Sequence, residues 1–122
     1  MPESTWVDNQ LAKSKLPYGM VCGIDMQGDA TEYIEFNKKI GRFRGFRQLT
    51  NWDEEKQMAI DKTITKNIWE DGQFVANLKK LEEAGATFDL MAEPCQWDSI
   101  AEVLSLVPKL TVIIDHRATC MM

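Results

Sequence analysis

The chain has 122 residues, a formal net charge of -5, and a composition that is 44% hydrophobic and 27% charged. This composition is typical of one soluble globular domain (1–122), and the acidic balance without a Lys/Arg cluster argues against nucleic-acid binding. The sequence has neither an apolar run of about 20 residues nor a signal peptide, so we expect a cytoplasmic protein without membrane contact. The cysteines Cys22, Cys95 and Cys120 form no C-x-x-C pair, which indicates free thiols.

Short apolar segments alternate with amphipathic segments in the first half of the chain. After an N-terminal helical or linker segment (1–18), residues 19–26 are short and apolar, which predicts a buried strand. Residues 30–40 place their apolar side chains on one face and are expected to form an amphipathic helix. Residues 43–48 are a second strand candidate, in which Gly45 indicates close backbone packing or a bend.

The second half continues the alternation after an irregular stretch. Residues 49–70 are polar and mixed, and we expect a long excursion with one helical turn. A helix capped by Asp71 and ended by Gly85 follows, then a strand over 86–91, and then a helix capped by Asp98. Residues 110–115 end the series with consecutive β-branched residues, which predicts a parallel strand buried on both faces.

This order of elements predicts an α/β fold with about four parallel strands joined by right-handed helical crossovers. Polar residues gather at or just past the ends of these strands, namely Asp25, Arg47, Glu93, Asp115 and His116. Ligands bind at the carboxyl ends of the strands both in open α/β sheets and in (β/α)8 barrels. We therefore expect these five side chains to lie close together.

Three segments carry a resemblance to a known family, and they occur in a fixed order: GRFRGFRQL (41–49), TFDLMAEP followed by QW (87–97), and VPKLTVIIDHRA (107–118). Together they resemble the amidohydrolase-related family of TIM-barrel, metal-dependent hydrolases, which includes lactonases and decarboxylases. The resemblance covers about residues 19–118, and its best signal is Gly-Phe-Arg at 45–47 combined with Asp115–His116.

The resemblance implies a partial (β/α)8 barrel and a hydrolase acting on a small lactone or similar carboxylated substrate. It implies that His116 and Asp115 are catalytic and that His116 ligates a divalent metal, zinc or manganese. It also implies that Arg47 and Glu93 bind the substrate, with Arg47 holding a carboxylate by paired hydrogen bonds.

The chain also departs from the family pattern. Family members open with a His-x-His metal motif, whereas His116 is the single histidine of this sequence, and Arg117–Ala118 replace the usual Leu-Gly. A mononuclear metal needs three or four ligands, so we expect this chain alone to bind none. We expect it to correspond to a middle segment, the third to sixth strands of the barrel.

Two hypotheses follow from this comparison. In the first, the chain is an incomplete or inactive piece of a hydrolase. In the second, it is a non-catalytic α/β binding or interaction module that forms a homo-oligomer through the exposed edges of a half-barrel.

Overall fold

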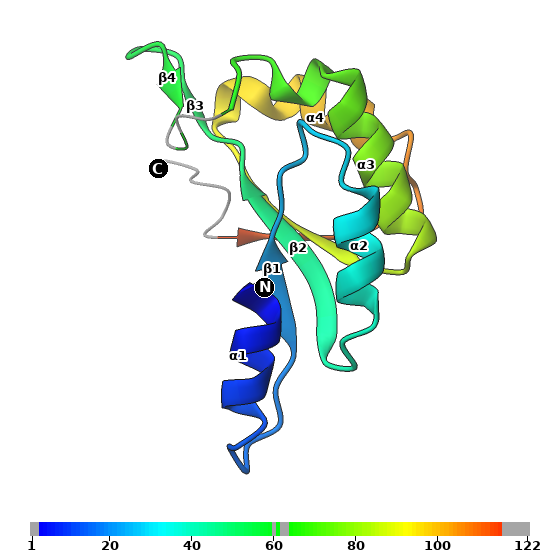
Figure 1. Cartoon of the computed structure of the whole chain (residues 1–122). Helices are drawn as coiled ribbons and strands as arrows, with labels where there is room; N and C mark the ends of the chain where they lie inside the picture. Colours follow the sequence, from blue (N-terminus) through cyan, green and yellow to red (C-terminus); the bar gives the residue numbers. More distant parts are fainter. Residues whose placement is uncertain (1–2, 60, 62–63, 116–122) are drawn as a thin grey trace.

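A computed structural model of the chain describes residues 3–59, 61 and 64–115 (Figure 1). Its helices are α1 (Glu3–Leu11), α2 (Thr31–Lys38), α3 (Gly72–Glu83) and α4 (Trp97–Leu104), with 3-10 turns η1 (Ile68–Glu70) and η2 (Pro94–Gln96). Its strands are β1 (Met20–Gly23), β2 (Phe43–Leu49), β3 (Trp52–Asp53), β4 (Met58–Ala59), β5 (Thr87–Met91) and β6 (Thr111–Ile114). Within the described ranges, no helix is both long and apolar enough to cross a membrane.

The principal sheet is four-stranded and parallel, with the order β1-β2-β5-β6, so neighbouring strands follow one another in the chain. Figure 1 shows α2, α3 and α4 on the same side of this sheet. Successive right-handed crossovers between parallel strands in chain order place every connecting helix on one face. The predicted α/β class, with four parallel strands and intervening helices, is confirmed.

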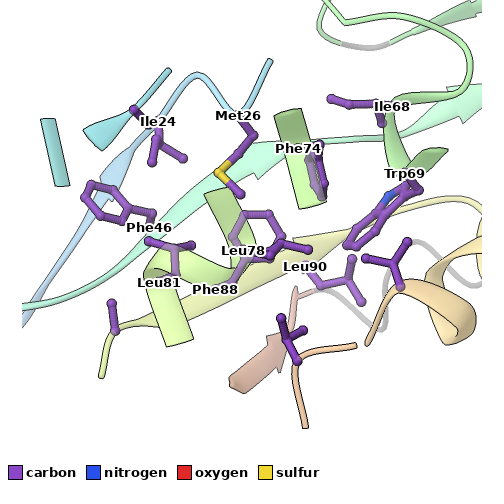
Figure 2. Close-up of a cluster of buried hydrophobic side chains, with 14 of the residues drawn as sticks. Ile24, Met26, Phe46, Ile68, Trp69, Phe74, Leu78, Leu81, Phe88 and Leu90 are labelled. Atoms are coloured by element: carbon purple, nitrogen blue, oxygen red, sulfur yellow. The ribbon is translucent and has the colours of Figure 1, made fainter. Parts of the chain in front are cut away.

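The core lies between α3 and the central strands (Figure 2). Phe74, Leu78 and Leu81 recur along α3 at helical spacing, and all three are fully buried together with Phe88 of β5. The ring of Phe74 lies 6.0 Å from that of Phe88 in an edge-to-face arrangement. Burial of these apolar side chains is the main force that holds α3 on the sheet.

Two local predictions about α3 are confirmed. The Asp71 side chain accepts hydrogen bonds from the backbone N–H groups of Gln73 and Phe74, which satisfies donors that the first helical turn leaves free. Gly85 follows the helix with a φ of 69°, a left-handed conformation that glycine adopts without steric cost.

The opposite side of the sheet, which we call the open face, is not covered by α2, α3 or α4 (Figure 1). Strand register places its side chains in two rows: Val21, Gly45, Thr87 and Thr111, then Gly23, Arg47, Asp89 and Ile113. Val21 is 45% exposed and Ile113 is 43% exposed. The open face is therefore a mixed surface with apolar ends and a charged centre.

Gly45 allows β2 and β5 to approach each other closely. A Cβ atom at this position would lie 2.0 Å from Oγ1 of Thr87 and 2.4 Å from its carbonyl oxygen. Both distances are far shorter than any real contact of a Cβ atom. The close backbone packing predicted at Gly45 is confirmed.

Other expectations need correction. The excursion over 49–70 contains the expected helical turn, η1, but also the antiparallel β3–β4 hairpin, which its polar sequence did not signal. The helix α4 begins at Trp97 rather than after a cap at Asp98, because a capping box between Glu93 and Gln96 starts the preceding turn η2.

The expectation that the last strand is buried on both faces is also wrong. β6 is an outer strand of the described sheet, and its residue Ile114 is 56% exposed. An apolar sequence shows that a strand can be buried on both faces. Whether it is buried depends on its neighbours, and β6 lies at the edge of the described sheet. Cys22 and Cys95 are free thiols, as expected, and Cys120 lies outside the described residues.

Candidate active site

Three charged side chains from three neighbouring strands meet toward the carboxyl ends of the sheet. Arg47 of β2 and Asp89 of β5 are partners in the strand register, and Asp115 directly follows β6. The Nη2 atom of Arg47 lies 3.4 Å from Oδ2 of Asp89, and its Nε atom lies 3.1 Å from Oδ2 of Asp115. We call these three residues the Arg47 cluster. The predicted convergence of Arg47 and Asp115 is thereby confirmed.

The members of the cluster differ sharply in burial. The Asp89 side chain is 6% exposed and that of Asp115 is 13% exposed, whereas the Arg47 side chain is 44% exposed. The carboxylates are therefore shielded beneath a guanidinium that still reaches solvent. Arginine has further N–H donors beyond the two that face these carboxylates, so an incoming anion or carbonyl can bind to it.

Burial and a neighbouring carboxylate change the acidity of Asp89. Desolvation raises its pKa first, and the negative charge of Asp115 and a hydrogen bond with the Asp115 side chain raise it further. Arg47 opposes these effects by stabilising the ionised form, and the net direction is upward. Asp89 is therefore the member of the pair that holds a proton more readily than an ordinary aspartate.

The cluster also has unused hydrogen-bonding capacity. Oδ1 of Asp89 is buried and accepts no hydrogen bond from any residue that the structure describes. The same holds for Oγ1 of Thr87, which lies in the adjacent row of the open face. Oδ2 of Asp115 is also buried without a hydrogen-bond partner among the described residues. Buried polar atoms are normally paired, so these three oxygens can be satisfied by a proton that the two carboxyl groups share or by a further group that binds there.

This arrangement suits acid–base chemistry. Where one carboxyl group retains its proton beside a second, ionised carboxylate, the first can act as a general acid and the second as a general base. Asp89 is the candidate acid because its pKa is raised, and Asp115 is the candidate base. Arg47 holds both in place and can stabilise negative charge that develops on a substrate.

The described residues of the cluster do not fit a divalent metal. Among residues 3–59, 61 and 64–115, no group of three His, Cys, Asp or Glu side chains could hold a metal ion. The guanidinium of Arg47 also lies against both carboxylates, where its positive charge repels a cation. His116, the predicted metal ligand and catalytic residue, lies outside the described residues.

The structure places Glu93 in the loop that follows β5. Its side chain forms the capping box of η2 with Gln96 and accepts a hydrogen bond from Nδ2 of Asn51 at 3.3 Å. Asp25 is exposed, and its Oδ1 accepts from the backbone N–H of Gln27 at 3.0 Å within its own loop. Substrate binding by Glu93 stays a prediction, and the known contacts of both carboxylates organise loops.

Sequence reasoning missed Asp89. The signal was present, because Asp89 is the single charged residue in the apolar strand 86–91. A charged side chain inside such a strand is buried at high cost unless it has a partner. The partner, Arg47, lies far away in the sequence and becomes visible only through the pairing of β2 with β5.

Buried amides hold the loops around these strand ends. Nδ2 of Asn77 on α3 donates to the carbonyl oxygens of Met26 and Gly28, at 2.9 and 2.7 Å. The backbone N–H of Met26 donates in turn to Oε1 of Gln48 at 3.0 Å. These bonds fix the loop after β1 to α3 and β2, so the edge that carries the cluster has a defined shape.

A cavity of about 390 Å³ lies beside the β3–β4 hairpin and not at the cluster. Its walls include Trp52, Lys66 and Cys95. Burial raises the pKa of the Cys95 thiol, and nearby acidic side chains raise it further, which keeps the thiol protonated and a weak nucleophile. Cys95 is therefore a weaker candidate for a reacting group than the members of the Arg47 cluster.

No protein-family model, curated protein or solved structure matches the chain. What the Arg47 cluster does must therefore be inferred from its own geometry and from the fold that carries it.

Proposed function

We propose that the chain is part of a (β/α)8-barrel hydrolase of the amidohydrolase-related kind and that the Arg47 cluster forms one wall of its active site. The observation that carries this proposal is the buried carboxylate pair, bridged by Arg47 and located toward the carboxyl ends of parallel strands. In barrel enzymes the loops and strand ends on this side hold the reacting groups.

The topology supports the barrel interpretation. Strands in chain order with their helices on one face are the repeating pattern of a (β/α)8 barrel, in which the other face becomes the interior. The open face has the layered rows of side chains that a barrel interior requires. Gly45 and Thr87 occupy one such row, where β2 and β5 approach each other closely.

The proposed substrate is a small lactone or a similar carboxylated compound. Arg47 binds the substrate carbonyl or carboxylate through its solvent-facing N–H groups. With both carboxyl groups ionised the cluster would carry one excess negative charge and repel an anion. With Asp89 protonated the cluster is neutral, so its raised pKa favours the binding of an anionic substrate.

The reaction assigned to the cluster is hydrolysis of the ring ester. Asp115 takes a proton from water as the oxygen attacks the lactone carbonyl, and Arg47 stabilises the resulting oxyanion. The ring C–O bond then breaks, and Asp89 donates its proton to the departing alkoxide. The products are a hydroxyl and a carboxylic acid, which ionises by releasing its proton to solvent, and the proton on Asp115 returns to Asp89.

A hydrolysis assay with cluster variants tests the proposal. The chain supplies one wall of the site, but all three proposed reacting groups lie within it, so we expect the wild-type chain to open small lactones faster than buffer does. Asp89→Asn should lower the rate by roughly 100-fold because it removes the acid. Asp25→Asn is the matched control, since Asp25 is an exposed carboxylate in the loop after β1 and should leave the rate unchanged. Equal rates for wild type and Asp89→Asn, or no hydrolysis above background, would overturn the proposal.

The exposed apolar positions on the open face favour a second candidate function. Val21 and Ile113 leave apolar surface accessible at both ends of the sheet, as expected of a non-catalytic α/β module that assembles through these edges. A folded chain that forms defined oligomers but opens no lactone would support this alternative over the hydrolase.

A further inference from the structure

The described sheet has two outer strands that are alike in length and direction. β1 and β6 stand at the two ends of the order β1-β2-β5-β6, each has four residues, and all four strands are parallel. Within the described chain, the outer side of each pairs with no other strand. Unpaired backbone N–H and C=O groups on such edges are available to a further strand.

A groove runs along β1 next to α1, and we call it the α1–β1 groove. It is a cavity of about 260 Å³ that extends along all four residues of β1, with apolar walls from Val7 and Leu11 of α1 and Tyr33 of α2 and polar walls from Glu3 and Ser4. Met20 and Cys22 alternate with Val21 and therefore face the helix-covered side of the sheet. The groove thus offers space with mixed walls along the outer edge of β1, and its part beside Met20 and Cys22 lies on the helix-covered side.

The other outer strand presents the complementary feature. Ile114 of β6 is in register with Leu90 of β5, a buried core residue, so Ile114 also lies on the helix-covered side. It is nevertheless 56% exposed. β6 therefore carries an apolar side chain on the same side of the sheet as the groove, without the cover that the inner strands have.

We propose that β6 of a second copy of this chain adds in parallel to the outer edge of β1, so that Ile114 of the partner subunit fills the α1–β1 groove. Side chains alternate identically in both strands, so Ile114 of the partner subunit lies on the same side as Met20 and Cys22, and the proposed register is the one that sets it beside them in the groove. The occupant is a second copy because the chain itself carries both the groove and the strand that matches it.

With twofold symmetry the same contact forms twice, which closes the assembly as a dimer. If β6 of each copy pairs with β1 of the other, four strands and four strands close into eight parallel strands, and the two open faces enclose one interior. All strands point the same way, so both Arg47 clusters lie at the same end. The inference goes beyond the proposed function, since the dimer forms whether or not the cluster hydrolyses a substrate.

Sedimentation of the purified full chain tests the assembly. We expect a mass twice the 14.0 kDa of the chain. Ile114→Asp should weaken dimerisation by roughly 30-fold or more, because it removes an apolar side chain and places a negative charge in a groove that Glu3 also lines. Leu106→Asp is the matched control: Leu106 is 55% exposed, lies in the connection between α4 and β6, and should leave the dimer intact. Circular dichroism should be unchanged in both variants.

Disulfide trapping tests the contact itself. In a Cys95→Ser, Cys120→Ser background, Ile114→Cys should form an intermolecular disulfide with Cys22 under a mild oxidant, since β1 and β6 of one chain lie at opposite ends of the sheet. Ile113→Cys is the control, because Ile113 points to the open face and should not trap Cys22.

Several results would overturn the inference. They are a monomeric wild-type chain, an open series of larger oligomers, an Ile114→Asp variant that stays dimeric, or a dimer that Ile114→Cys does not trap. A monomer that still opens lactones would reject the dimer and leave the proposed hydrolase standing, whereas an inactive dimer with the trapped contact would do the reverse.

Discussion

Replacing Gly45 with alanine should destabilise the fold strongly, although it adds a single methyl group. The new Cβ atom would lie 2.0 Å from Oγ1 and 2.4 Å from the carbonyl oxygen of Thr87. Rotation of the Thr87 side chain can move Oγ1 away, but the carbonyl oxygen belongs to the backbone of β5. The two strands must therefore separate, which strains the parallel pairing at the centre of the sheet.

The magnitude follows from two opposing contributions. Overpacking a well-packed site costs about 1–3 kcal/mol, and a backbone clash belongs at the upper end of that range. Alanine also restricts the unfolded chain, which stabilises the folded state by about 0.4–1 kcal/mol. We expect the free energy of unfolding to fall by about 2 kcal/mol in Gly45→Ala.

Urea unfolding followed by the fluorescence of the buried Trp69 and by circular dichroism measures this change. Gly23→Ala is the matched control, because Gly23 also lies on the open face but has no atom within 4 Å of its added Cβ. It should change stability by less than about 0.5 kcal/mol. Thr87→Ala should rescue Gly45→Ala only in part, since the carbonyl contact remains. A Gly45→Ala chain as stable as wild type, with the same urea dependence, would refute the described packing of β2 against β5.

Three further predictions concern buried polar groups and charges. Because the pKa of Asp89 is raised, the folded state is penalised for ionising it above that pKa, and the penalty disappears as the pH falls toward the ordinary value of 3.8. The free energy of unfolding of Asp89→Asn minus that of wild type should therefore be larger at pH 7 than at pH 4. An identical difference at both pH values in urea unfolding would contradict this. Hydrogen bonds from Thr31 and the charge of Lys80 lower the pKa of Asp29 to about 2, so an NMR titration should place its midpoint there, and Lys80→Met should raise it only part of the way toward 3.8. Asn77→Ala should lower the free energy of unfolding by about 3 kcal/mol, because it leaves buried carbonyl groups without a donor, and amide exchange should accelerate in the loop after β1; unchanged exchange there would count against the role of this amide.

The sequence by itself determined the strands of the parallel sheet, its connecting helices and several of their boundaries. Asp71 and Gly85 mark the start and end of α3 because capping and left-handed backbone are properties of single residues and their immediate neighbours. The short segments at β1, β2, β5 and β6 predicted parallel strands for the same reason: alternation with amphipathic helices is a local pattern. Parallel strands also predicted that Arg47 and Asp115 would meet, since their carboxyl ends share one edge.

Only the tertiary structure decided which side chains became partners and which strands became edges. Asp89 pairs with Arg47 because β5 aligns with β2 in one register, and that register depends on contacts between residues far apart in the chain. The burial expected on both faces of β6 failed for the same reason, since burial depends on what packs against a strand and not on its own sequence. Local chemistry therefore set the elements of this protein, whereas strand order and register created its charged cluster and its exposed edge.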